Sequence, residues 1–414
     1  MAAHLCRRAT SNARQLCTLR TFTVQKIRTL LSDAYYCNAA WDQRNKLTTS
    51  LGELTKKIES KFTMKEAIKH PVSSIDIDTY VNNVETKDQL DQAKEFLYRY
   101  RHSPVAFYLR DFTVHAWIRT CLKLGVVDEA FSTVQNKVHY GLFPDNYSFN
   151  LILDTYIKEG DIQKAMSVAI EMMQQEVLRA EEDLSQLLAL HTCHQYLNSN
   201  DDIEDEMKKQ IGMTLIDSTR GQDHIVSMTY HLIGLAMSGD IEKTVKRLSK
   251  LLESENLPCV LQEAVDSLRK AYLNKDEIQE QEEDDGVIIY DVQAEQELEN
   301  KLQALLDHLE KDCLSDGKLN DLAEVYITSQ LSDLEKPHIE SYPGFLEDRY
   351  QDAKRGLEKQ IASREARIAE VKAKEREIWK LMISKPGEDM PSPPTLTEED
   401  KRIISKQEKY IYED

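Results

Sequence analysis

Residues 112–130 read FTVHAWIRTCLKLGVVDEA, and residues 147–165 read YSFNLILDTYIKEGDIQKA. At the offset of 35 residues that aligns them, four positions are identical: Thr120/Thr155, Lys123/Lys158, Gly125/Gly160 and Ala130/Ala165. A repeat of this length is typical of stacked helical pairs, because one pair alone cannot bury its own apolar face. The first helix of each pair is expected to end at its glycine, in a left-handed cap. The chain is therefore predicted to be an all-α, helical-repeat solenoid.

Composition and pattern divide the chain into five segments. Helical pairs opened by polar caps and closed by Gly, Pro or Asn predict a helical-repeat domain over residues 33–275. Residues 276–299 hold eleven Asp or Glu and no Lys or Arg, so charge repulsion predicts an extended acidic linker. A C-terminal helical or coiled-coil region is expected over residues 300–384, and a mostly disordered tail over residues 385–414. The first 32 residues form the remaining segment.

Residues 1–32 are basic, rich in Ser and Thr, and free of Asp and Glu. That composition is typical of a mitochondrial transit peptide, and a disordered basic tail is the alternative. We expect import into the mitochondrial matrix. Cleavage would remove six uncompensated positive charges from a chain of net charge −19, which leaves −25. A protein this acidic binds nucleic acid only through a local basic patch.

Motifs that carry chemistry are missing from the sequence. It holds no phosphate-binding loop, dinucleotide fingerprint, nucleophile elbow or zinc-protease motif, so no enzymatic activity, cofactor or small-molecule substrate is expected. The seven cysteines form no CxxC pair, which favours free thiols. His191 and His194 could share one helix face, but two ligands without a second pair favour a structural role over a metal site. No apolar run reaches the ~18 residues that would predict a membrane span.

A heptad pattern marks the C-terminal region. Its apolar seam consists of Leu357, Ile361, Ile368, Val371, Ile378 and Met382, and the two remaining seam positions hold Arg364 and Glu375. This spacing predicts a coiled coil or a single long amphipathic helix. Pairing with another chain and packing on a larger assembly are both compatible with the pattern.

The stretch from Phe96 to Tyr140 departs from the acidic average of the chain. Basic residues outnumber acids there, and aromatic side chains are interleaved with them. Such a mixture suits RNA, because bases stack on aromatic rings and phosphates take the charge. The alternative is that the aromatics form the core and the arginines are solvated. The candidate RNA-binding residues of this stretch are Arg99, Arg101, His102, Arg110, His115, Arg119, Lys123 and Lys137.

The 35-residue unit, with its Lys-x-Gly and its closing Pro144-Asp145, resembles the pentatricopeptide repeat. In that family two positions per repeat read one RNA base. The resemblance places His115 with Asp145 and Asn150 with Ala180 at these positions, so Asn150 joins the candidate RNA-binding residues. His115 and Ala180 are not usual partners there. Recognition of RNA shape or backbone is therefore expected rather than base-by-base reading.

A denser resemblance covers roughly residues 95–176, including Tyr98–Pro104 and Asn136–Asn146. This region is similar to the pentatricopeptide-repeat proteins of the animal mitochondrial small ribosomal subunit. The resemblance implies a structural RNA-binding component that supports mitochondrial translation. Its partners would be small-subunit mitochondrial rRNA and other mitochondrial small-subunit ribosomal proteins. Two alternatives stay open: a tetratricopeptide-type protein-interaction scaffold, and a pentatricopeptide-repeat factor that processes mitochondrial transcripts.

Overall fold

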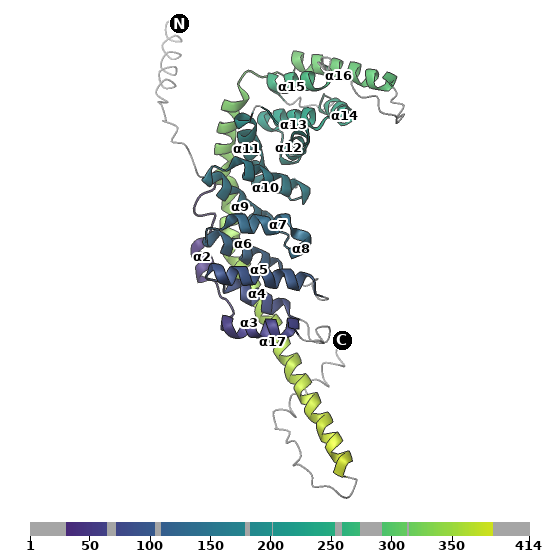
Figure 1. Ribbon diagram of the computed structural model, residues 1–414. Coiled ribbons are helices and arrows are strands. Elements are labelled where there is room, and N and C mark those ends of the chain that lie inside the picture. Colours follow the sequence, from purple (N-terminus) through teal and green to yellow (C-terminus); the bar gives the residue numbers. More distant parts are fainter. Residues whose placement is uncertain are drawn as a thin grey trace, which may run out of the picture. The chain divides into compact units, whose positions relative to one another are not determined.

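Helices are the main secondary structure of the described part of the chain, which otherwise holds turns, short irregular segments and one isolated bridge between Val260 and Leu314 (Figure 1). The computed structural model describes residues 30–63, 72–103, 109–178, 183–200, 202–252, 259–273, 292–312 and 314–383. Within these ranges there are sixteen helices, α2 to α17, and the prediction of an all-α helical-repeat fold is confirmed. Most of the expected transit peptide and the whole expected C-terminal tail lie outside the described residues. Of the expected acidic linker, residues 292–299 are described, and they begin α16.

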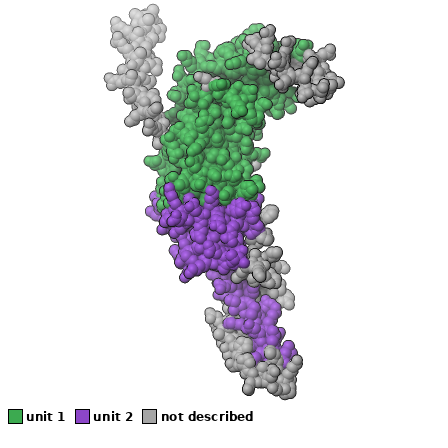
Figure 2. Space-filling view, viewed as in Figure 1, with its two compact units in different colours: residues 1–38, 117–341 green, residues 39–116, 342–414 purple. Residues whose placement is uncertain are grey.

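The chain divides into two compact units, coloured separately in Figure 2. Unit 1 comprises residues 1–38 and 117–341, and unit 2 comprises residues 39–116 and 342–414. Three helices contribute residues to both units: α2 (Asn38–Gln43), α6 (Asp111–Lys123) and α17 (Leu319–Ile383). Each unit is described on its own below.

In unit 2, three consecutive helices pack in order: α3 (Leu51–Thr63), α4 (Ser74–Asn82) and α5 (Lys87–Arg101). Local side chains fix where these helices begin. The Ser73 hydroxyl accepts a hydrogen bond from the first turn of α4, and Thr86 with Gln89 forms a capping box on α5. The buried side chains between α4 and α5 include Tyr80 and Phe96, whose rings meet edge to face at 5.0 Å.

Unit 1 contains ten complete helices within its described residues. They are α7 (Val127–Gln135), α8 (Lys137–Tyr140), α9 (Asn146–Glu159), α10 (Ile162–Gln174), α11 (Asp183–Ser199), α12 (Asp205–Ser218), α13 (Ile225–Ser238), α14 (Ile241–Leu252), α15 (Gln262–Tyr272) and α16 (Val292–Asp312). From α9 to α14 each helix packs against the next (Figure 1). Gly125 and Gly160 have φ angles of 67° and 78°, so the predicted left-handed caps are confirmed.

The contact between α12 and α13 is close enough to involve the backbones. A Cβ added at Gly234 would lie 2.8 Å from the carbonyl oxygen of Gly212. A Cβ added at Gly212 would lie 2.7 Å from the carbonyl oxygen of Gly234. Only glycine at both positions lets the two helices cross at this distance.

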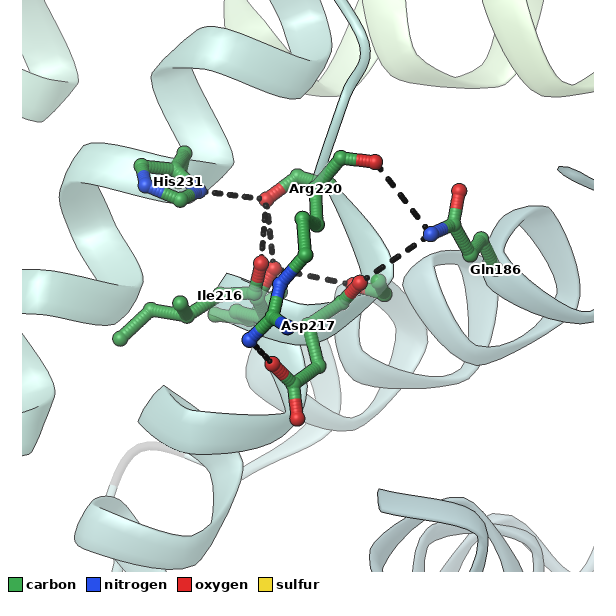
Figure 3. Close-up of polar contacts among 8 residues, drawn as sticks. Gln186, Ile216, Asp217, Arg220 and His231 are labelled. Carbon is green, nitrogen blue, oxygen red and sulfur yellow. Dashed lines mark hydrogen bonds and ion pairs between the residues drawn. The ribbon is translucent and has the colours of Figure 1, made fainter. Parts of the chain in front are cut away.

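A polar network closes the turn after α12 (Figure 3). The Gln186 amide of α11 donates to the carbonyl oxygens of Asp217 and Arg220, at 3.4 and 3.3 Å. Thr219 in the turn and His231 in α13 share a buried hydrogen bond of 3.0 Å. Burial, with the nearby positive charge of Arg247 and Arg220, lowers the pKa of His231 to about 4. The imidazole is therefore neutral in the folded protein at pH 7.

The last described helix, α17, is much longer than the heptad pattern predicts. It extends over 65 residues and starts at Leu319, which is well before the expected seam. Its first part, up to Ser341, belongs to unit 1, and the remainder belongs to unit 2. The prediction of a long C-terminal helix is confirmed. Pairing of that helix with another chain stays a prediction.

Candidate functional site

In unit 1, residues 31–36, which include the last two residues of the expected transit peptide, lie against α9 and bond to a buried carboxylate. Asp154 is 0% exposed and accepts hydrogen bonds from the Leu31 amide at 2.9 Å and the Tyr36 hydroxyl at 2.6 Å. Lys158, one turn further along α9, supplies the balancing charge at 2.8 Å. A buried carboxylate with these three donors fixes residues 31–36, which we call the N-terminal strap, on the helix.

The strap also covers Asn150, one of the predicted RNA-binding residues. Asn150 is 0% exposed, and its amide nitrogen donates to the Tyr35 hydroxyl at 3.1 Å. The Tyr35 ring stacks on Tyr147 with centroids 4.9 Å apart, and the Tyr147 hydroxyl donates to the Tyr35 carbonyl at 2.7 Å. An aromatic ring of the chain itself therefore lies where a pentatricopeptide repeat would present Asn150 to a base.

Arg119 is buried in the same place. Its guanidinium group donates to the backbone carbonyl of Tyr36, to the Asn38 side chain at 3.2 Å and to the Tyr147 hydroxyl at 3.3 Å. The guanidinium group therefore donates its hydrogen bonds to oxygen atoms of the strap and of neighbouring residues. In this structure Arg119 stabilises the N-terminal strap and leaves no exposed face for a phosphate.

In unit 2, His115 is buried among aromatic rings and bonds to a tyrosine hydroxyl, as Asn150 does in unit 1. Its Nε2 atom lies 2.8 Å from the Tyr342 hydroxyl of α17, and the imidazole is 2% exposed. The rings of Trp41, Phe112 and Phe345 pack around it with centroids 5.7 to 6.3 Å away. This is an aromatic core in which the histidine satisfies its polar nitrogen with a tyrosine.

His115 and Asn150 occupy the same place in successive repeats, since they are separated by the repeat offset in the aligned stretches. Each is buried, and each is hydrogen-bonded to a tyrosine hydroxyl from outside the repeat. Sequence reasoning missed both tyrosines because Tyr35 and Tyr342 lie 115 and 227 residues from their partners. We call each of these positions, together with its tyrosine partner, a filled face: one at His115 in unit 2 and one at Asn150 in unit 1.

The other predicted residues are more accessible. In unit 2, Arg99 pairs with Glu95 at 3.4 Å and lies over the Phe62 ring, while Arg101 is half-buried at the end of α5. His102 caps α5 and packs on the exposed ring of Tyr98, with centroids 4.3 Å apart.

Arg110 of unit 2 has an internal electrostatic role. Burial raises the pKa of Asp78 to about 6, and the Thr113 hydroxyl and the positive charge of Arg110 oppose that rise. In unit 1, Lys137 forms an ion pair with Glu171, and Lys123 is exposed at the end of α6. The nine predicted residues thus fall into a buried group and an accessible group, and they are divided between the two units.

The described residues do not assemble a metal centre. No group of three His, Cys, Asp or Glu side chains lies close enough there to hold a metal ion. His194 bonds to the Tyr230 hydroxyl, and burial lowers the pKa of His191 to about 4. None of the described helices is long and apolar enough to cross a membrane.

Comparison with known proteins gives two kinds of match. The sequence is 25% identical over 186 residues to human "Pentatricopeptide repeat-containing protein 2, mitochondrial", a match that covers 44% of this chain and 46% of the relative. The mouse protein of that name is 24% identical over 206 residues, 49% of each chain, and the Xenopus laevis protein is 27% identical over 126 residues, 30% of this chain and 32% of the relative. The chain spans at most about half the length of these relatives.

The second match covers almost the whole chain. The sequence model of the family described as "Mitochondrial 28S ribosomal protein S27" matches residues 1–378. That range includes both copies of the 35-residue repeat, the helices of both units and nearly all of α17. The chain therefore belongs to the mitochondrial 28S ribosomal protein S27 family.

Proposed function

We propose that this protein is a structural, RNA-contacting component of the small subunit of the mitochondrial ribosome, located in the matrix. The match of the ribosomal family to residues 1–378 is the observation that carries the proposal. A non-enzymatic role is supported by the helical-repeat fold. Matrix location agrees with the composition of residues 1–32 and with relatives whose names contain the word mitochondrial.

The RNA contact proposed here does not use a base code. His115 and Asn150 hold tyrosines of the chain itself, so a base would have to displace a packed aromatic ring to reach either residue. Basic side chains lie at the end of α5, where Arg101 is half-buried and the exposed His102 packs on the exposed ring of Tyr98. Lys123 is an exposed cation in unit 1. These groups suit contacts to phosphates and exposed bases without fixed sequence.

Sedimentation of mitochondrial lysate through sucrose gradients tests the placement in the subunit. With EDTA the two ribosomal subunits separate, and without it they remain joined. The proposal expects the protein to migrate with the small-subunit rRNA in both gradients. A protein that stays in the light fractions and ignores dissociation of the ribosome would contradict it.

The distal part of α17 is the surface proposed to meet a neighbouring protein of the subunit. Ile361, Ile368 and Ile378 are 47%, 43% and 56% exposed, and they lie on one helical stripe. Arg364 and Glu375 interrupt the stripe and have no ion-pair partner among the described residues. The complementary occupant is an amphipathic helix with an acidic residue opposite Arg364 and a basic residue opposite Glu375.

Charge reversal identifies that occupant. Arg364→Glu should weaken incorporation into the subunit, because it places like charges in an apolar contact, and Glu375→Arg should do the same. In an antiparallel pair of two copies of this chain, Arg364 would face Glu375 of the other copy. The double reversal would then restore association of the free protein. A partner of different sequence is supported if the double variant incorporates worse than either single variant.

A further inference from the structure

Helix α14 combines a buried apolar face with an unusually basic outer face. Its twelve residues, IEKTVKRLSKLL, contain four basic residues and one acidic residue, in a chain whose net charge is −19. Val245, Leu248 and Leu251 are buried in the core that α14 shares with α13, α15 and α16. The apolar side of the helix is therefore fully used inside unit 1.

The four cations lie on the opposite side. At about 100° per residue, Lys243, Lys246, Arg247 and Lys250 fall within an arc of roughly 100° around the helix axis. The three lysines are exposed, and Arg247 is half-buried. Lys243 to Lys250 extends about 10 Å along the helix at about 1.5 Å per residue.

Most of this charge is not neutralised within the described residues. Lys243 pairs with Asp240 at the start of the helix, at 2.8 Å. Lys246 and Lys250 form no ion pair with any described side chain, and the Nε atom of Arg247 is buried without a hydrogen-bond partner. Arg247 also lies near enough to His231 to help lower its pKa, so the positive potential extends to the neighbouring helix. In an acidic protein, such a concentration of unpaired cations indicates an external anionic partner.

We propose that this face of α14 binds the phosphate backbone of RNA. The proposal rests on the proposed function and adds a surface that the sequence-based search did not select. A basic amphipathic helix can also lie on a membrane or in a peptide-binding groove, but both modes need the apolar face, which is in the core here. Point charges on flexible stems, without adjoining apolar contacts, suit phosphates and give little base preference.

The expected effect follows from counterion release. Each lysine–phosphate contact contributes about 0.7–0.9 to the slope of log affinity against log salt, depending on whether the RNA is single- or double-stranded. Removal of three contacts should lower that slope by about 2 and the affinity by about ten- to a hundredfold near 0.1 M salt. Because the lysines are exposed, their loss should leave the fold intact.

The test titrates the full chain into a labelled transcript of the small-subunit mitochondrial rRNA over a series of salt concentrations. The variant is Lys243→Gln/Lys246→Gln/Lys250→Gln. A matched control, Lys354→Gln/Lys359→Gln/Lys380→Gln, removes the same charge from exposed lysines of α17. We expect the α14 variant to lose affinity and salt dependence while the control stays within about twofold of the unmodified chain, with equal thermal unfolding for all three proteins.

Three outcomes would contradict the inference, and they are distinguishable. Equal affinity of the α14 variant and the control overturns the α14 site and leaves the proposed function standing. An unmodified chain that does not bind the transcript and does not migrate with the small subunit overturns the proposed function itself. If the α14 variant keeps its RNA affinity but no longer joins the small subunit, the partner of this face is an acidic protein.

Discussion

Two surfaces of unit 1 use their charged and polar groups in opposite ways. On α9 and the adjoining end of α6, Asn150 and Arg119 are buried, and the N-terminal strap takes their hydrogen bonds. On α14, Lys246 and Lys250 are exposed and have no described partner. The position of a residue in the repeat therefore does not decide which surface is available to RNA. The decisive feature is whether the chain already satisfies that residue.

The N-terminal strap is the element that buries Asn150 and Arg119. Substitution of Asp154, which anchors the strap, should therefore cause the largest loss of stability. Replacement of Asp154 by Ala leaves the Leu31 amide, the Tyr36 hydroxyl and Lys158 without their shared acceptor. Loss of one partner of a buried pair costs about 3–5 kcal/mol. Urea unfolding should show this loss for Asp154→Ala.

The matched control is Asp333→Ala, which removes an exposed carboxylate of unit 1 that pairs with Lys336. Its cost should stay at about 0–1 kcal/mol, because surface ion pairs are worth little. If both substitutions lower the free energy of unfolding by the same amount, the strap does not stabilise unit 1. The filled face at Asn150 would then not be a fixed feature of the protein.

Helix α14, which carries the basic face, packs on α13, and α13 in turn packs closely on α12. Gly234→Ala should destabilise unit 1 by about 2–3 kcal/mol, since the added methyl group would meet the backbone of α12. Gly344→Ala in α17 is the matched control, because a Cβ there meets nothing within 4 Å. Alanine is favoured over glycine in an unobstructed helix, so this variant should gain about 0.5–1 kcal/mol. A lower unfolding temperature for Gly234→Ala together with a higher one for Gly344→Ala would support the close α12–α13 crossing. A higher unfolding temperature for both variants would refute it.

Acid should weaken the same region through His231. Its pKa in the folded protein is about 4, below the ordinary 6.5, so the unfolded chain binds the proton more readily. The contribution of His231 to stability is therefore complete above about pH 6.5 and is lost as the pH falls toward 4. Between pH 7 and pH 5 the loss should be about 2 kcal/mol. Urea unfolding of His231→Gln at both pH values should show a correspondingly smaller drop, and an equal drop in both proteins would exclude this histidine as the cause.

The smallest loss of stability is expected when a single tyrosine hydroxyl is removed from the filled face at His115. Tyr342→Phe removes the hydroxyl that bonds to Nε2 of His115 and should cost about 1–2 kcal/mol, because a buried hydrogen bond is lost. RNA affinity should not change. A gain in RNA affinity would show that the tyrosine competes with a base at His115.

The sequence predicted the elements that depend on local spacing. The offset of 35 residues and the glycines at 125 and 160 were sufficient for the helical pairs and their caps. The start of α17 was not predicted because the heptad seam begins only at Leu357, and the helix continues through Pro337 and Pro343, a residue type that normally ends a helix. Tertiary packing overrides local preference there.

The candidate site was harder to predict than the fold. The composition of residues 96–140 identified real cations, but it could not show that Arg119 and His115 are buried by residues 36 and 342. Contacts so distant along the chain leave no periodic signal. The basic face of α14 did have a signal, the spacing of Lys243, Lys246, Arg247 and Lys250, which a search for helical charge stripes would have found.

The most direct test of the account maps RNA–protein crosslinks by mass spectrometry on small subunits irradiated in their assembled state. The account predicts RNA adducts on the peptide that contains Lys246 and Lys250, and none on the peptides that contain His115 and Asn150. Adducts on Asn150 or His115, with α14 unmodified, would contradict it. They would show that RNA displaces the tyrosines and reads the repeat positions after all.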